Sequence, residues 1–521
     1  MKKVYILALL VAAVVILGCA QPTEQPSEEA KKVKIELWWT PSHYGDTEKD
    51  LAQVLKEQLE ATGMFEVELK SAEWSTYVDY ARKSAMMASL FGWYPDYLDP
   101  DDYTTPFLKC TANNWLGYPY CDEEMDQLLE QASVATTMEE REQLYKQIQQ
   151  KLAEDAPIIP LVQGKLTIVA KDDIKGITLD PTMIFRYYLV YSEEQKDTIT
   201  IGVTDKITDL DPSNAYDFYT WEILNNIMGG LVRYKPGTTE LEPYLAESWN
   251  VSDNGLVYTF KLREDLKFAD GTPCKAQDVV RSVKRVMTIQ GDPSWLVTDF
   301  VEDVEAVDDY TVKFTLKKPT AYFIALLATP PYFPVHPAYK AEEIDPDQTA
   351  GGVGPYKIVD WKRDQELILE ANPNFFGDQP MTKRIVIKFY KDATTLRLAM
   401  EKGEVDIAWR TLAPIDIESL KEKEGLQVIE APGGFIRYLV LNANENTDYP
   451  TKNIYIRRAI AAAIDREDIA QRVYRGTVEP LYSLVPIGMW SHEDVFKDMY
   501  GDGNIELAKE YLEKYFEEAG S

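Results

Sequence analysis

The chain has 521 residues, 45% of them hydrophobic, and a formal net charge of −31. A chain of this length normally folds into two or more domains, and its hydrophobic content is ample for sizeable cores. The excess of acidic residues argues against nucleic acid as a partner, because binding to nucleic acid needs clustered Lys and Arg.

The N-terminus has the features of a secretory signal followed by a tether. Two lysines precede an apolar run that is too short to span a membrane comfortably, and the motif ILGC ends at Cys19. We expect residues 1–18 to be a signal peptide, with lipid on the Cys19 sulfur after cleavage. Residues 19–32 predict a flexible tether that anchors the protein to the outer face of a membrane, at the cell surface or in the periplasm.

Hydrophobic periodicity predicts alternating strands and helices along the rest of the chain. In chain order we expect strand 33–39, helix 47–62, strand 65–69, helix 74–88, strand 85–91, a long helical region 122–152 and strand 157–169. There follow strand 198–203, helix 220–228, strand 258–262, helix 278–287, strand 312–316, a hairpin over 353–369, strand 384–389, helix 393–402, strand 405–408, strand 435–441, helix 454–464 and helix 505–518. This alternation indicates mixed α/β lobes.

Two of the four cysteines predict a disulfide. Cys110 and Cys121 flank a loop that contains Asn and Gly, and an exported protein meets an oxidising compartment. Their spacing is not a zinc signature, and no histidine lies nearby to complete one. Cys274 has no partner, and we expect it to be half-buried at the start of a helix.

Sequence motifs for catalysis, cofactors and metals are missing. The three histidines are scattered, and the chain has neither a Gly-x-Ser-x-Gly elbow nor a phosphate-binding Gly-x4-Gly-Lys loop. Nothing selects a catalytic pair among the 86 acidic residues. We therefore expect no enzyme activity, no cofactor and no metal, with a secreted α/β hydrolase as the distant alternative.

The most informative segment is GWYPDYLDPDDY, residues 92–103. It follows a predicted strand, and α/β proteins place their ligand sites at strand ends. Two prolines stiffen its backbone, and it packs four aromatic residues and four carboxylates into twelve positions. Rigid aromatic faces beside an acidic group suit a ligand with an ammonium group and apolar side chains. An acidic surface turn is the alternative interpretation.

Six segments together resemble one family. They are ELEPYLAESWNVSDNGLVYTFKLREDLKFADGTPCKAQDVVRSV, LDPSNAYDFY, GGVGPYKIVDW, EKGEVDI, IRRAIAAAIDREDIA and FGWYPDYLDPDDY. They are similar to the dipeptide- and oligopeptide-binding lipoproteins of peptide ABC importers. The resemblance implies a two-lobed, type II periplasmic-binding-protein fold in its large three-subdomain form. It also implies a monomer that captures peptides and delivers them to a membrane permease with its ATPases.

The order of these segments departs from the family. The usual mature protein begins at a strand like 198–203 and ends after a segment like 185–191. Here the final third of the family pattern, about residues 33–191, comes first. The resemblance therefore implies a circularly permuted chain, in which residues 192–196 join the ancestral ends.

The permuted order implies a domain map. Lobe II would combine residues 33–163 with 433–521. Lobe I would be the continuous block 164–432, with an inserted subdomain at about 239–351. Two crossovers, near residues 163 and 432, would form the hinge.

The resemblance also implies site residues. Asp96 matches the aspartate that pairs with the ligand's α-ammonium in oligopeptide-binding relatives. The other expected ligand-contacting residues are aromatic: Trp93, Trp74, Tyr216, Phe218, Trp295, Trp409 and Phe435.

One departure bears on the ligand. Dipeptide-specific relatives hold the ligand carboxylate with an arginine in the stretch that corresponds to residues 39–44, where this chain has only His43 and Tyr44. Longer peptides, whose C-terminus is held loosely or through water, therefore fit better than strict dipeptides. An oligosaccharide is the alternative ligand within the family, because Trp and Tyr can stack on sugar rings.

Overall fold

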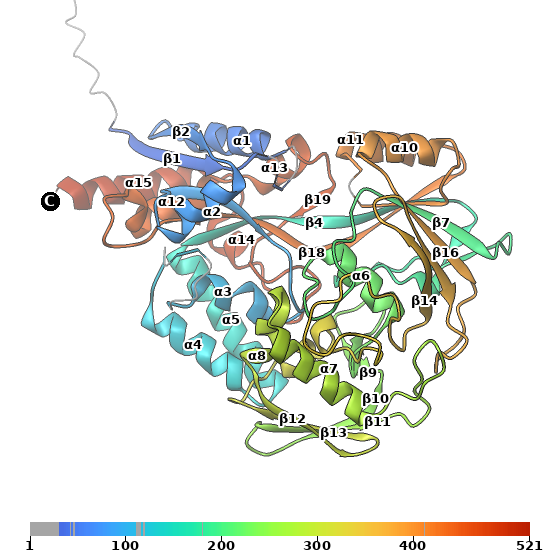
Figure 1. Cartoon of the computed structure of the whole chain (residues 1–521). Coiled ribbons are helices and arrows are strands. Elements are labelled where there is room, and N and C mark those ends of the chain that lie inside the picture. The colour runs from blue at the N-terminus through green and yellow to red at the C-terminus, as the bar shows by residue number, and fades with distance from the viewer. Residues whose placement is uncertain are drawn as a thin grey trace, which may run out of the picture.

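The computed structural model describes residues 31–41, 43–44, 47–110, 116–117, 120–179, 181–410 and 412–520. Its architecture is mixed α/β, as predicted, and is built around one large sheet (Figure 1). The expected signal peptide, Cys19 and nearly all of the tether lie outside the described residues. Within the described ranges, no helix combines the length and apolar character needed to cross a bilayer.

Within the described residues, the large sheet has eleven strands. In spatial order they are β14 (Tyr356–Lys362), β15 (Glu366–Ala371), β16 (Arg384–Phe389), β7 (Thr198–Val203), β17 (Ile407–Trp409), β4 (Ile158–Lys171), β18 (Leu426–Leu441), β3 (Ala88–Trp93), β1 (Val33–Trp39) and β2 (Phe65–Ser71), with β19 (Val478–Pro480) paired to β4. A separate antiparallel sheet contains β10 (Ala246–Val251), β11 (Val257–Leu262), β13 (Thr311–Leu316) and β12 (Val301–Asp308), and two short pairs join β5 (Ile174–Lys175) to β6 (Tyr191–Ser192) and β8 (Val232–Tyr234) to β9 (Leu241–Pro243).

Helices cover these sheets (Figure 1). They are α1 (Glu48–Glu60), α2 (Trp74–Arg82), α3 (Thr105–Leu108), α4 (Glu123–Val134), α5 (Met138–Asp155), α6 (Phe218–Ile227), α7 (Ala276–Ile289), α8 (Trp295–Thr298), α9 (Phe323–Leu326), α10 (Ala393–Glu401), α11 (Pro414–Lys421), α12 (Ile454–Ala463), α13 (Arg466–Arg472), α14 (Val495–Tyr500) and α15 (Ile505–Gly520).

Two helix predictions were wrong in their bounds. The helix expected over 74–88 ends at Arg82, because Ser84 has a left-handed φ of 51° and Ala88 already begins β3. The single helical region expected over 122–152 is broken before Thr137, whose hydroxyl accepts a hydrogen bond from the Glu140 N–H and starts α5.

The buried hydrophobic residues form two large clusters. The terminal core takes its members mainly from residues 33–162 and 436–512, so both ends of the described chain build it. The central core takes its members mainly from residues 166–409. A small third cluster lies under α10 and α11. Along the chain, membership changes from the terminal to the central core between Val162 and Leu166 and back between Trp409 and Ile436. The lobe boundaries near residues 163 and 432 stay predictions.

Strands β4 and β18 connect the two cores. They pair antiparallel over almost their whole length, and their register shifts between Pro432 and Ile436, at Gly433 and Gly434. The chain passes from the terminal to the central core along β4 and returns along β18. The cores are therefore joined by two neighbouring strands.

The N-terminal strand completes the sheet of the terminal core. Leu37 of β1 pairs with Ala88 of β3, and Leu90 of β3 pairs with Leu439 of β18. The circular-permutation hypothesis requires this arrangement, because it places residues 33–39 and 435–441 in one lobe. The permutation itself stays a prediction.

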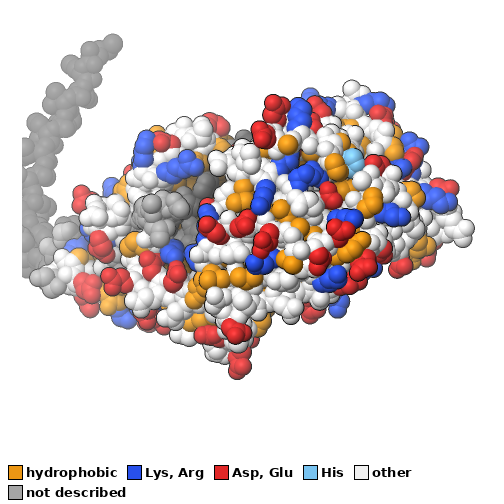
Figure 2. Space-filling view, turned by 60° about the horizontal axis from the view of Figure 1, so that its bottom comes forward, with side chains coloured by type: hydrophobic (Ala, Val, Ile, Leu, Met, Phe, Trp, Pro, Cys, Tyr) orange, Lys and Arg blue, Asp and Glu red, His pale blue; other side chains and the backbone are white. Residues whose placement is uncertain are grey.

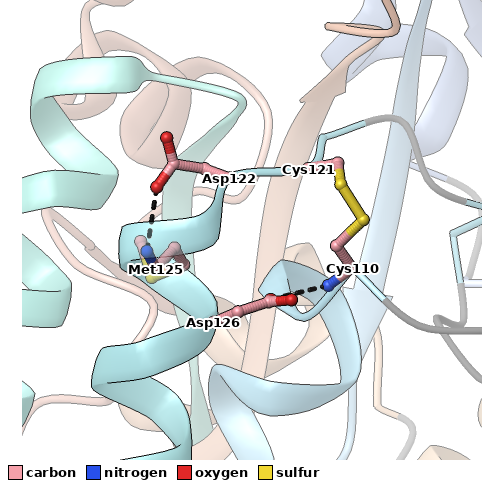
Figure 3. The surroundings of a disulfide bond; sticks show 5 residues. All are labelled: Cys110, Cys121, Asp122, Met125 and Asp126. Carbon is pink, nitrogen blue, oxygen red and sulfur yellow. Dashed lines mark hydrogen bonds between the residues drawn. A yellow bond between two sulfur atoms is a disulfide. The ribbon is translucent and has the colours of Figure 1, made fainter.

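The structure joins Cys110 and Cys121 in a disulfide with 4.7 Å between the Cα atoms (Figure 3). The Cys110 N–H donates to Asp126 on α4 over 2.8 Å, so the bridge is held against that helix. Cys274 lies just before α7 and is only 2% exposed, which is deeper than the half-burial that we expected.

The surface in Figure 2 carries acidic and basic side chains interspersed with hydrophobic ones. Exposed pairs such as Lys83–Asp79, at 2.7 Å, are common on the described part of the chain. Pairs of this kind contribute little to stability.

Candidate functional site

A cleft opens where strands of the two cores point at each other. β7 and β17 lie in the central core and pair near one end of the β4–β18 ladder, whereas β3 pairs with its other end. Their carboxyl ends face across a cavity of about 410 Å³. Its lining residues are Tyr94, Pro95, Asp96, Asp205, Tyr216, Asp217, Phe218, Tyr219, Trp221 and Arg410. Its size and its mixture of aromatic and charged groups are typical of a small-molecule site.

Buried carboxylates hold the segment that presents Asp96. Asp99 accepts two hydrogen bonds from Arg141 on α5, at 2.7 and 2.9 Å, and both side chains are buried. Asp101 accepts a hydrogen bond from the Tyr97 hydroxyl at 3.0 Å. These pairs are charge-assisted and shielded from water, so they fix the loop after β3 firmly.

Asp102 holds Asp96 and Trp93 in place through hydrogen bonds. Its carboxylate accepts the Asp96 N–H at 2.8 Å and the Trp93 indole N–H at 3.3 Å. Trp93 packs edge-on against Phe107, with 4.9 Å between ring centroids. The structure thus places Trp93 as a support for the loop, beside the cleft and not among its lining residues.

Asp96 spans the cleft to the central core. Its carboxylate accepts a 2.7 Å hydrogen bond from the Tyr216 hydroxyl. Burial raises the pKa of Asp96 to about 6. Burial, followed by the charge of Asp96, also holds the pKa of Asp102 well above its usual range. A cation beside Asp96 would relieve this cost, so the arrangement favours a ligand ammonium group.

Aromatic rings form one wall of the cleft. Tyr94 stacks on Phe435 with ring centroids 4.1 Å apart, and its other neighbour Phe218 lies at 4.8 Å. Trp295 lies close enough to hydrogen-bond Tyr216, which places it beside the Asp96 contact. Residues from both cores therefore build this apolar face.

Trp74 lies behind that wall. It stacks on His43 with 3.5 Å between ring centroids, and Tyr44 is at 5.6 Å from it. Tyr44 in turn lies 6.3 Å from Phe435. His43 and Tyr44, which stand in the stretch where the family resemblance led us to look for an arginine, thus take part in aromatic stacking.

Trp409 is placed in the core. It is 1% exposed, and its indole N–H donates to Glu222 at 2.9 Å. We therefore assign it no ligand contact, although the next residue, Arg410, lines the cleft.

The structure brings Asp96, Tyr216 and Phe218 together in the cleft wall, while Phe435 and Trp295 touch that wall from outside. Sequence reasoning missed Asp205 and Arg410. Both follow strands that the sequence predicted, β7 and β17, so the strand-end argument that selected Asp96 could also have selected them.

The comparisons with known proteins agree on one family. The family model of the bacterial extracellular solute-binding proteins, family 5 Middle, matches residues 21–115 and 240–520. The probable D,D-dipeptide-binding periplasmic protein DdpA of Escherichia coli is 31% identical over 337 residues, which cover 61% of this chain and 64% of that protein.

The dipeptide-binding protein DppE of Bacillus subtilis is 30% identical over 342 residues, 60% of each chain. The crystal structure of the ABC transporter substrate-binding protein CtaP from Listeria monocytogenes superposes with a TM-score of 0.52, at 26% identity over 61% of this chain and 65% of that one. The chain thus spans somewhat under two thirds of the length of these relatives.

Proposed function

This chain belongs to the bacterial extracellular solute-binding proteins of family 5, and from that premise we propose that it is the peptide receptor of an ABC transporter. It works in the periplasm or at the cell surface, captures peptides between its two cores and delivers them to a membrane permease. The names of the two curated relatives, which are both dipeptide-binding proteins, support this proposal. The receptor catalyses no reaction.

One observation indicates which class of ligand the cleft binds. Asp96 is a half-buried carboxylate in the cleft, and its described partners are the Tyr216 hydroxyl and its own loop, with no cation among them. A peptide α-ammonium supplies the missing charge, while Tyr94 and Phe218 offer apolar surface to side chains.

Closure of the cleft follows from the two cores. We propose that the terminal core is lobe II, residues 33–163 with 433–521, and that the central core is lobe I, residues 164–432 with a subdomain inserted at about 239–351. The lobes move about the two crossovers, and a ligand that contacts both lobes stabilises the closed form.

The experiment begins with the bound material. Mass spectrometry of ligand stripped from the purified protein is expected to find peptides, whereas sugars would favour an oligosaccharide receptor. Calorimetry then compares a peptide pool with its N-acetylated counterpart. We expect acetylation to abolish most of the binding, and Asp96→Asn to weaken it by on the order of 2–5 kcal/mol.

The control is Asp253→Asn, which changes an exposed aspartate in the β10–β11 turn. It should bind like the wild type. Equal affinity for free and acetylated peptides would remove the amine role of Asp96.

We also propose that Cys19 carries the lipid anchor. The proposal rests on the ILGC motif and on family membership, since Cys19 lies outside the described residues. Cys19→Ser is expected to move the protein from the membrane fraction to the soluble fraction and to abolish labelling by a fatty-acid probe. Retention of the label in the variant would contradict the assignment.

A further inference from the structure

Arg410 occupies an unusual place in the cleft. It follows β17 directly, and its backbone has a left-handed φ of 61°. A side chain other than glycine adopts this conformation only when its surroundings enforce it, and such residues cluster at ligand-binding positions. β17 runs parallel to β7 with Ala408 opposite Gly202, so Arg410 lies beside Asp205, the residue two places after β7.

The guanidinium group of Arg410 is only partly satisfied. Its Nε lies 3.3 Å from Asp205, and the side chain is 16% exposed. Its Nη1 is buried and has no hydrogen-bond partner among the described residues. A buried donor without a partner is costly, so this edge of the guanidinium is poised to bind an acceptor.

The neighbouring carboxylates are already engaged. Asp217 accepts the Thr220 N–H at 2.8 Å, which caps α6, and also the Thr208 hydroxyl at 3.0 Å. Glu222 accepts hydrogen bonds from Tyr187 at 2.5 Å and from Trp409 at 2.9 Å. Among the described residues, the cleft thus combines Asp96, whose carboxylate accepts only the Tyr216 hydroxyl and does not cap a helix, with one arginine that has a free edge.

We infer that Arg410 binds the C-terminal carboxylate of the ligand and that the cleft takes short zwitterionic peptides. This inference rests on the proposed function. Arg410 follows β17 of the central core, Asp96 follows β3 of the terminal core, and both line the same cavity of about 410 Å³. The volume of this cavity is near the lower end of the range for ligand pockets, so it suits a short peptide better than a long one. The planar guanidinium suits a carboxylate, and its position differs from the stretch 39–44 in which the sequence led us to seek an arginine.

The test uses the full chain and defined probes. Calorimetry compares dialanine, trialanine and pentaalanine, each as the free acid and as the C-terminal amide. For the wild type we expect the free acids of the two shorter peptides to bind at least tenfold more tightly than their amides, and more tightly than pentaalanine. Arg410→Gln is expected to weaken free-acid binding by about tenfold to a hundredfold and to bring the acid-to-amide ratio close to one.

Two further variants sharpen the result. Arg475→Gln is the matched control, because Arg475 has a similar left-handed φ of 51° and an ion pair with Glu418 at 3.9 Å but does not line the cleft. It should keep the wild-type ratio. Arg410→Lys retains the charge and should keep part of the preference for free acids.

The possible outcomes distinguish a failure of this inference from a failure of the proposed peptide-receptor function. A wild type that binds acids and amides equally well overturns the inference and leaves peptide binding intact, and this result needs no variant to fold. An unchanged acid-to-amide ratio in a folded Arg410→Gln variant overturns it as well. A wild type that binds none of the peptides would overturn both the inference and the proposed function.

Discussion

The buried negative charge of Asp96 lowers the stability of the folded protein. Its ordinary pKa is 3.8, and burial raises it to about 6, so the folded state binds the proton more tightly than the unfolded state does. The resulting loss of stability is absent below pH 3.8, grows as the pH rises to about 6 and is complete above that.

Asp96→Asn should therefore stabilise the unliganded protein at pH 7. Because solvent reaches this half-buried side chain, we expect a gain on the order of 1 kcal/mol. The gain should shrink towards zero near pH 4, and thermal melts at the two pH values measure it. Asp102 lies beside Asp96 and has a raised pKa too, so Asp253→Asn serves as the control for a general effect of removing charge. An equal gain at both pH values would show that the raised pKa is not its source.

Glu48 and Arg437 form a buried ion pair in the terminal core. Both side chains are 2% exposed, and the Nε and Nη1 atoms of Arg437 have no hydrogen-bond partner among the described residues. Burial raises the pKa of Glu48 even though Arg437 lies against it. Glu48→Ala leaves a guanidinium buried without its counter-charge.

We expect Glu48→Ala to lower the free energy of unfolding by about 3–5 kcal/mol in urea titrations. The matched control is Glu57→Ala, which removes an exposed pair with Arg472 at 2.6 Å and should cost less than about 1 kcal/mol. If the two variants lose similar free energies of unfolding, the burial of the Glu48–Arg437 pair does not make its loss more destabilising than that of an exposed pair.

The site was predictable only where a motif is local. Asp96 stands in a rigid, aromatic segment that signals a ligand site by itself. Arg410 also follows a predicted strand, but no motif surrounds it, and its place beside Asp205 became visible only once the register of β7 and β17 was known. Trp409 shows the converse, since its place on a short strand end did not reveal that its indole turns towards Glu222.

At the scale of elements, the disulfide connects the end of α3 to the start of α4 (Figure 3). Closing a loop of eleven residues should contribute somewhat under ~3 kcal/mol in the chain-entropy model. A double variant with serine at positions 110 and 121 is expected to melt earlier than the wild type by a corresponding amount.

Reducing agent supplies the control for the disulfide. It should lower the melting temperature of the wild type and leave the double variant unchanged. Peptide mapping under non-reducing conditions should recover the linked pair, and recovery of both thiols in free form would refute the bridge.

Periodicity located most elements because each buries one face, but it failed where single residues decide a boundary. The strand expected over 435–441 begins at Leu426, nine residues earlier. Pro432 and the two glycines after it are turn residues, so the sequence suggested a break there. The strand continues past them because β4 pairs with it on both sides of the bulge.

At the scale of the whole molecule, the segment order can be tested by reversing it. A rearranged chain would join residue 520 to residue 31 through a short linker and open between residues 192 and 197. If the present order is a circular permutation, this chain should fold, form the same disulfide and bind the same peptides. Its free energy of unfolding should differ by roughly 1 kcal/mol, because only loop lengths change.

Circular dichroism, non-reduced mapping and calorimetry follow the rearranged chain. An insoluble or unfolded product would contradict the permutation, as would a folded product that has lost its ligand.

The mixed α/β class was predictable from the alternation of elements. The sharing of one sheet by both chain ends was visible only through the family resemblance, since no local pattern encodes pairing across some 400 residues.

The two adjacent crossover strands also restrict how the cores can move. Sliding of β4 against β18 would break their ladder along its length, whereas we expect twisting to break fewer hydrogen bonds at Gly433 and Gly434, where the register is already shifted. If the two cores are the lobes that we propose, we therefore expect their relative motion to be a rotation about one axis through the bulge. The displacement of a residue then grows in proportion to its distance from that axis. On ligand binding, the distance between two fluorescent labels placed near Gln163 should therefore hardly change. The distance between labels on α4 and α10 should show the largest change.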